Sequence, residues 1–106
     1  MNAMSNNRGE KEIRLNGNIP AGTVRSLVQP VQVFITDTFL KVNFNASLGT
    51  ISLFVYDETG SVVYRQSVNT YAGQQIRIDI TAFEEGEYTI ELVNSQNEYL
   101  CGSFEI

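Results

Sequence analysis

The sequence contains no histidine, no tryptophan and one cysteine among its 106 residues. Zinc sites built from imidazole and thiolate are therefore excluded, and so are catalytic dyads and triads in which histidine is the base. A single cysteine also cannot form a disulfide within the chain. At this length folding buries roughly two-thirds of the surface of the unfolded chain. We therefore expect one domain that is stabilised by a hydrophobic core, with no cofactor and no catalytic residues.

Basic residues are few and do not cluster. The chain has seven lysines and arginines and twelve aspartates and glutamates, which give a formal net charge of −5. Residues 1–78 hold all seven basic residues and five acidic ones, whereas residues 79–106 hold seven acidic residues and no basic one. Without a basic cluster we expect no binding to nucleic acid. The sequence also has no apolar run of the length that a membrane helix requires. We expect attachment to a membrane only through a lipid anchor that lies outside this sequence.

The first residues of the chain are polar and include two methionines. This composition predicts a disordered tail over residues 1–11, followed by a single domain over residues 12–106. We interpret Met1 to Ala3 as a cloning remnant. These residues do not form a signal peptide, and we expect that a natural leader has been cut off.

From residue 30 onward, short segments rich in Val, Ile, Phe, Tyr and Thr are separated by Gly, Asn and Asp. In residues 39–45 and 74–80 apolar and polar side chains alternate, which is typical of strands with one solvated face. In residues 51–56 both alternating sets are largely apolar, which indicates a central strand that is partly covered on both faces. Further strands are predicted over residues 12–15, 30–36, 61–68, 87–93 and 99–106.

These eight segments, of which the one over residues 12–15 is short, predict an all-β fold, and we assign a seven-stranded immunoglobulin-like antiparallel two-sheet sandwich, with a small barrel as the alternative. Residues 57–60 (Asp-Glu-Thr-Gly) and 94–97 (Asn-Ser-Gln-Asn) predict hairpins between the strands on either side. Residues 81–88 end in Gly-Glu-Tyr, which is typical of a tyrosine corner, where the buried Tyr88 hydroxyl bonds to upstream backbone. Gly102, inside the last strand, indicates a bulge or a close approach of another backbone segment.

Three motifs resemble those of a known family: residues 55–64 (Val-Tyr-Asp-Glu-Thr-Gly-Ser-Val-Val-Tyr), 86–90 (Gly-Glu-Tyr-Thr-Ile) and 102–106 (Gly-Ser-Phe-Glu-Ile). Over residues 39–106 the chain is similar to the small Bacteroidetes domains grouped as domain of unknown function 3244, and residues 12–30 match more weakly. The first two motifs are also similar to C-terminal sorting domains of type IX secretion. The resemblance implies a sandwich fold in a secreted or periplasmic protein. It implies no activity and no functional residues.

If the strands alternate in direction, the connections between them gather at two ends that differ in chemistry. One end collects six carboxylates, from Asp37, Asp57, Glu58, Glu84, Glu85 and Glu87. Oxygen ligands on convergent loops are those that Ca²⁺ takes, and paired carboxylates can serve a glycosidase as acid and base. The carboxylates lack EF-hand spacing, and the loops are too short to build a cleft. We therefore favour a solvated rim over a calcium site or an enzyme.

The opposite end collects the connections 46–49, 69–75 and 94–97, none of which contains a charged residue. Tyr with Asn, Gln, Ser and Gly is the composition with which antibody loops contact antigens. We predict that this end binds a protein or a glycan. The alternative is that turns use Asn, Gly and Ser for backbone reasons alone and that the tyrosine folds over the core. The candidate binding residues are Asn69, Tyr71, Gln74, Asn94, Gln96 and Asn97.

The strand over residues 61–68 carries one charge, Arg65, and is a candidate edge of its sheet. Edge strands expose backbone groups with which another chain can pair. We predict that this strand, or the terminal strand over residues 99–106, pairs with another chain, and a weak homodimer is one form of this pairing. The alternative is a monomer whose edge is protected by Arg65.

Together these features predict a non-catalytic, exported accessory domain that binds a protein or a glycan at the cell surface or in the periplasm. The alternative function is a sorting or attachment module of a secretion pathway. A sorting module would route a fused passenger outward, whereas an accessory domain would retain a partner.

Overall fold

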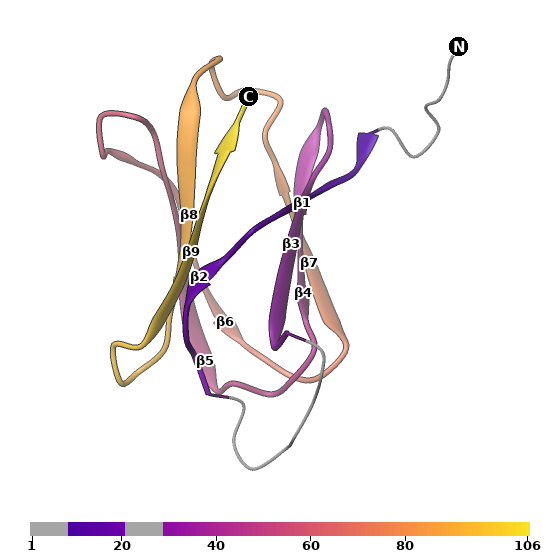
Figure 1. The fold of residues 1–106 in the computed structure, drawn as a ribbon, viewed down its shortest axis with the longest axis vertical. Helices are drawn as coiled ribbons and strands as arrows, with labels where there is room; N and C mark the ends of the chain where they lie inside the picture. Colours follow the sequence, from indigo (N-terminus) through magenta and orange to yellow (C-terminus); the bar gives the residue numbers. More distant parts are fainter. Residues whose placement is uncertain (1–8, 21–28) are drawn as a thin grey trace.

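The structure, a computed structural model, describes residues 9–20 and 29–106, which form two antiparallel sheets packed face to face (Figure 1). The four-stranded sheet has the order β1-β3-β4-β7, with β1 Lys11–Ile13, β3 Val31–Ile35, β4 Phe39–Phe44 and β7 Gln74–Asp79. The five-stranded sheet has the order β2-β9-β8-β5-β6, with β2 Asn16–Gly17, β9 Tyr99–Glu105, β8 Glu87–Val93, β5 Thr50–Tyr56 and β6 Val62–Asn69. The predicted antiparallel two-sheet sandwich is confirmed.

The described residues form nine strands, which corrects the predicted seven-stranded sandwich and is one more than the eight segments that the sequence indicated. The segments predicted from residue 30 onward correspond to β3 through β9. The N-terminal segment, predicted as one short strand over residues 12–15, divides instead into β1 and β2, because the chain crosses from one sheet to the other after Ile13 (Figure 1). Most of the predicted tail, residues 1–8, lies outside the described residues.

Alternation of side chains along the strands builds the core between the sheets. In β4 the side chains of Leu40, Val42 and Phe44 are fully buried, whereas those between them are half-buried on the outer face. Burial of a large aliphatic or aromatic side chain stabilises the fold by about 1.5–3 kcal/mol. The period-2 pattern of residues 39–45 therefore reports directly which face of β4 meets the other sheet.

Strand β5 is a central strand, as its two apolar faces predicted. It pairs with β6 on one side and with β8 on the other. Its inward side chains, Ile51, Leu53 and Val55, are fully buried. On the outer face the ring of Phe54 stacks on that of Tyr56, with 6.0 Å between the ring centroids. This stacking accounts for the second apolar set in the strand.

Both predicted hairpins are present, since β5 pairs with β6 and β8 pairs with β9. In the first turn Asp57 Oδ1 accepts hydrogen bonds from the backbone N–H groups of Thr59 and Ser61, each at 3.0 Å. Gly60 adopts a φ of 88°, which is the left-handed region that glycine enters at least cost. The aspartate side chain and the glycine backbone together close this turn.

The tyrosine corner is also confirmed. The Tyr88 hydroxyl donates a hydrogen bond of 2.6 Å to the backbone carbonyl of Glu84. The Tyr88 ring is buried and stacks on Phe104 at 5.7 Å between centroids. The corner therefore ties the connection after β7 to the start of β8.

Replacing Tyr88 with phenylalanine should lower the free energy of unfolding by about 1 kcal/mol, because it removes this hydrogen bond and keeps the ring. Urea unfolding monitored by circular dichroism measures the loss. Tyr71→Phe is the matched control, since the Tyr71 side chain is 60% exposed. Equal stability of Tyr88→Phe and the wild type would contradict the structural role of the corner.

Strand β6 lies at the edge of the five-stranded sheet, as predicted from its sequence. Val62 and Val63, at the start of the strand, are 49% and 40% exposed. Dimerisation through this edge stays a prediction. A molar mass in solution that does not change with protein concentration would contradict it.

Gly102 marks a close approach between backbone segments and not a bulge, because the register of β9 against β8 runs through it without a shift. A Cβ atom added at Gly102 would lie 2.5 Å from the carbonyl oxygen of Arg14 and 2.9 Å from Cγ2 of Ile13. Such distances are too short for any side chain. Glycine at this position therefore lets the crossing chain between β1 and β2 pass directly over β9.

Candidate functional site

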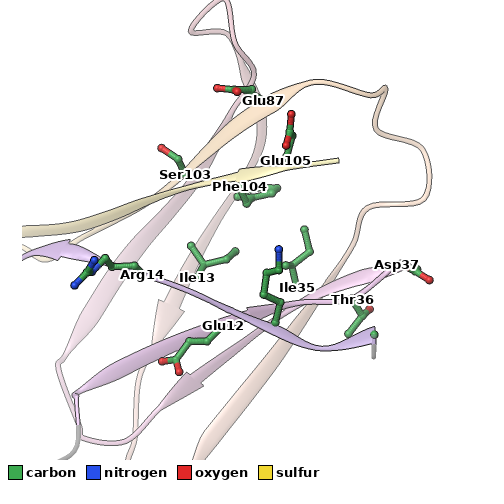
Figure 2. A pocket seen from close by; sticks show the side chains of 12 residues that line it. Glu12, Ile13, Arg14, Ile35, Thr36, Asp37, Glu87, Ser103, Phe104 and Glu105 are labelled. Carbon is green, nitrogen blue, oxygen red and sulfur yellow. The ribbon is translucent and has the colours of Figure 1, made fainter. Parts of the chain in front are cut away.

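A groove of about 530 Å³ lies between β1 of the four-stranded sheet and β9 of the five-stranded sheet (Figure 2). It exists because the chain leaves β3 after Ile13 and reaches β9 only at Asn16 and Gly17, which pair with Cys101 and Leu100. The second half of β9 is therefore not paired with β1 or β2. The groove follows this second half toward the end of the sandwich at which β8 begins.

The backbone of β9 turns alternate residues toward the groove. Ile106 and Gly86 exchange both backbone hydrogen bonds, and such pairs recur at every second residue of an antiparallel ladder. Gly102 and Phe104 therefore bond to β8, whereas the N–H and C=O groups of Ser103 and Glu105 point to the opposite side. Within residues 9–20 and 29–106, no strand pairs with Ser103 or Glu105 on that side.

The floor of the groove is apolar. The side chains of Ile13, Ile35 and Phe104 point toward one another between the two strands (Figure 2). Ile13 and Phe104 are 5% and 8% exposed, and Ile35 is half-buried at the margin of the core. Among the residues that the structure describes, a strand edge with free backbone groups thus lies beside apolar side chains at the margin of the core, a combination that suits an extended peptide.

The rim of the groove carries more negative than positive charge. Glu87 and Glu105 are cross-strand partners on the outer face of the five-stranded sheet. Partners of this kind have Cβ atoms about 4.5–5.5 Å apart, and like charges in such positions repel each other. Within the described residues the one ion pair joins Lys41 to Glu10, so neither Glu87 nor Glu105 takes part in an ion pair there. The charged lining residues are Lys11, Glu12, Arg14, Asp37, Glu87 and Glu105.

A second hollow of about 410 Å³ adjoins the groove on the outer face and shares Glu87 and Ser103 with it. Tyr56, Asp57 and Glu58 also line this hollow. Glu58 Oε1 accepts a hydrogen bond of 3.2 Å from the backbone N–H of Glu87. This contact brings a further carboxylate beside the pair of glutamates, so the negative charge extends around the rim.

The predicted acidic end is a real end of the sandwich, because the connections β3–β4, β5–β6 and β7–β8 lie together at the top of Figure 1. Hydrogen bonds from the Thr59 hydroxyl and the Ser61 N–H lower the pKa of Asp57 below its usual value. Bonds from Thr81 lower the pKa of Asp79 in the same way. Among the described residues no group of three or more His, Cys, Asp or Glu side chains could hold a metal ion.

The lowered pKa of Asp57 predicts a dependence of stability on acid. The Asp57 carboxyl group is more acidic in the folded than in the unfolded state. Its contribution to the free energy of unfolding is therefore complete above the unfolded pKa, about 3.9. This contribution is lost as the pH falls through the lower folded pKa. Between neutral pH and about pH 2.5, Asp57→Asn should therefore lose less stability than the wild type. Urea unfolding at the two pH values measures this difference.

Asp37→Asn is the matched control for this experiment, because the Asp37 carboxylate accepts no hydrogen bond within the part of the chain that the structure describes. The control should keep the acid dependence of the wild type. An equal reduction in both variants would show that general charge repulsion, and not the turn around Asp57, produces the effect.

The predicted uncharged end is likewise a real end, at which the connections β4–β5, β6–β7 and β8–β9 lie (bottom of Figure 1). The turns β6–β7 and β8–β9 lie at opposite sides of this end, so the six candidate residues do not form one cluster. Tyr71 is 60% exposed and does not fold over the core. Binding at this end stays a prediction.

Several of the six candidates have a local structural role. Gln74 Oε1 accepts a hydrogen bond of 3.1 Å from the backbone N–H of Tyr71, and Asn69 Oδ1 accepts one of 2.9 Å from the Thr50 hydroxyl. Asn94 Oδ1 closes its turn by accepting the N–H groups of Gln96 and Glu98 at 2.9 Å each. Asn97 has a φ of 66°. Turn chemistry thus accounts for Gln74, Asn94 and Asn97 without a ligand.

The sheet order, the tyrosine corner and the N-terminal strand that changes sheets define an immunoglobulin-like β-sandwich. The chain belongs to the family described as Domain of unknown function (DUF3244), whose family model matches residues 12–106. This confirms the family that the sequence motifs indicated.

The chain is also similar to a crystal structure of a DUF3244 family protein with an immunoglobulin-like β-sandwich fold from Bacteroides vulgatus. The TM-score is 0.75 and the sequence identity 23%, over 92% of this chain and 98% of that one. The likeness confirms the predicted immunoglobulin-like fold. No curated protein matches the chain.

Sequence reasoning did not identify the groove. Its lining comes from three segments that are distant in the sequence, around Ile13, Ile35 and Phe104, and none of them contains a motif for binding. The one local signal was Gly102, which indicates that another segment passes over β9 at the inner end of the groove.

Proposed function

We propose that this chain is a non-catalytic binding domain that acts outside the cytoplasm and holds a segment of a protein partner in the groove between β1 and β9. The observation that carries the proposal is the unpaired edge of β9 at Ser103 and Glu105, which lies above the apolar floor in the described part of the chain. Extended peptides bind to free strand edges through main-chain hydrogen bonds, and the side chains on either side of the edge give specificity.

Capture of partners from the native host tests the proposal. The purified domain is immobilised and exposed to membrane, periplasmic and culture-supernatant fractions. The groove variant is Ser103→Pro, which removes the N–H group that faces the groove and leaves the bonds to β8 intact. The control variant combines Tyr71→Ala with Gln74→Ala at the uncharged end, and circular dichroism verifies that both variants fold.

We expect a protein that the wild type and the loop variant retain and that Ser103→Pro does not. If only the Tyr71→Ala plus Gln74→Ala variant fails to retain the partner, binding takes place at the uncharged end and the proposed site is overturned. Retention of a glycan, or of nothing, would overturn the proposed partner.

The non-catalytic part of the proposal is supported by the chemistry of the carboxylates. A general acid needs a carboxyl group whose pKa is raised by desolvation. The hydrogen bonds at Asp57 and Asp79 lower the pKa of both groups, and the sequence has no histidine that could replace them. Release of reducing sugar from a panel of polysaccharides, abolished by Glu84→Gln or Glu85→Gln, would contradict this part.

The location outside the cytoplasm rests on the resemblance of the sequence motifs to secreted and periplasmic bacterial domains. Among the described residues no helix has the length and hydropathy needed to cross a membrane. Fractionation of the native host, with an antibody against the domain, should place the protein in the periplasm, at the cell surface or in the medium. Recovery from the cytoplasm alone would overturn this location.

A further inference from the structure

In the described part of the chain, the groove side of the second half of β9 has no strand beside it, so the five-stranded sheet could be extended there. Strand β2 covers β9 only at Leu100 and Cys101. Beyond the crossing at Gly102, the backbone groups of Ser103 and Glu105 face the groove, and within the described ranges no strand pairs with them. A strand placed there would continue the line of β2 and extend the sheet.

We propose that the groove takes an extended peptide segment of a partner, in which apolar and basic side chains alternate, and that this segment adds to β9 as a strand. The inference rests on the proposed function and specifies the chemistry of the partner. Its backbone would pair with Ser103 and Glu105, and successive side chains would point to opposite faces of the extended sheet.

The two faces of the added strand meet different chemistry. Side chains that point inward meet the apolar floor of Ile13, Ile35 and Phe104 (Figure 2). Side chains that point outward meet the facing pair Glu87 and Glu105. An apolar residue therefore suits each inward position and a lysine or arginine each outward one.

Charge complementarity selects a basic peptide over an acidic one. The facing glutamates repel each other, and a cation placed between them would relieve that repulsion. Glu58 adds a third carboxylate through its bond to the Glu87 backbone. Of the two basic lining residues, Arg14 extends away from the apolar floor (Figure 2), whereas Lys11 lies two residues before Ile13 in β1 and so shares its face, at the outer end of the floor. Neither belongs to the face that the outward side chains meet.

The probe is an eight-residue peptide of alternating valine and lysine with blocked ends, and its binding to the full chain is measured by fluorescence anisotropy. A peptide of the same composition, with four valines followed by four lysines, tests the alternation. An alternating valine and glutamate peptide tests the charge. We expect the alternating basic peptide to bind most tightly, and equal binding of all three would overturn the inference.

Variants of the protein locate the contact. Glu87→Gln and Glu105→Gln should each weaken binding of the basic peptide about two- to fivefold, as expected for exposed ion pairs. Glu84→Gln is the matched control, because it removes one charge at the same end of the sandwich but does not line the groove. An equal effect of all three substitutions would show attraction by net charge alone and would overturn the site.

N-methylated peptides test strand addition without altering the protein. Two versions of the basic peptide carry N-methyl groups on alternate residues, so that each version blocks one edge of the extended strand. The version that blocks the edge facing β9 should bind about tenfold more weakly, and the other should bind as the parent does. Weaker binding of both N-methylated peptides, or of neither, would overturn strand addition.

The outcomes separate this inference from the proposed function. A protein partner that is captured by the wild type and lost with Ser103→Pro, together with no preference among the peptides, would support the proposed function and reject the alternating basic segment. Preference for the alternating basic peptide, without a captured partner, would support the groove chemistry and reject the proposed function in the native host.

Discussion

Truncation of Phe44 to alanine is expected to lower the free energy of unfolding by about 3–5 kcal/mol. The Phe44 side chain is fully buried between the sheets and is the largest of the fully buried side chains. Its removal takes away the transfer free energy of the ring and leaves a cavity that the surrounding strands fill only in part. Chemical denaturation monitored by circular dichroism measures this loss.

Tyr71→Ala is the control for this prediction, since Tyr71 is an aromatic residue at the same end of the sandwich but is 60% exposed. It should change stability by less than about 0.5 kcal/mol. Comparable losses in the two variants would contradict the assignment of the core. If Tyr71→Ala leaves the stability unchanged, the same variant can also test the predicted binding at the uncharged end.

Replacement of Gly102 with alanine is expected to cost about 1–3 kcal/mol, because the added methyl group overpacks the crossing of the N-terminal chain over β9. The new atom would lie 2.5 Å from a backbone oxygen of Arg14 and 3.0 Å from Cδ2 of Leu15. A backbone segment cannot move aside as a flexible side chain can. The crossing chain must therefore shift, and the inner end of the groove must shift with it.

Gly9→Ala is the matched control for Gly102→Ala. Gly9 also lines the groove, but an added Cβ there meets no atom within 4 Å. The free energy of unfolding of the Gly9→Ala variant should stay within about 0.5 kcal/mol of the wild-type value. A Gly102→Ala protein as stable as the control would show that the N-terminal segment does not cross β9 as described.

Much of the fold could be predicted because its determinants are local. The alternation in residues 39–45 identified Leu40, Val42 and Phe44 as core, since a strand turns every second side chain to the same face. The sequence Gly-Glu-Tyr at residues 86–88 identified the tyrosine corner for the same reason, because the hydroxyl bonds to backbone only four residues upstream. Local pattern and local contact coincide in these elements.

The N-terminal region could not be predicted in this way. Arg14 and Leu15 show no alternation, because they belong to neither sheet and cross between the two. The pairing of Asn16 with Cys101 joins opposite ends of the chain, and no local pattern encodes a partner at that distance. The position of the groove depends on where this crossing occurs, so no local sequence pattern could predict it. The candidate residues at the uncharged end were chosen by composition, and composition does not separate binding residues from those that close turns.

Amide hydrogen exchange of β9, measured by NMR on the protein alone and with the alternating valine and lysine peptide, tests the central claim most directly. We predict that the amides of Gly102 and Phe104 exchange slowly, because they bond to β8, and that those of Ser103 and Glu105 exchange quickly until the peptide protects them. Protection of Ser103 and Glu105 in the protein alone would show that this edge is already paired. An unchanged rate at saturating peptide would show that no strand adds to β9, and either result would contradict the account.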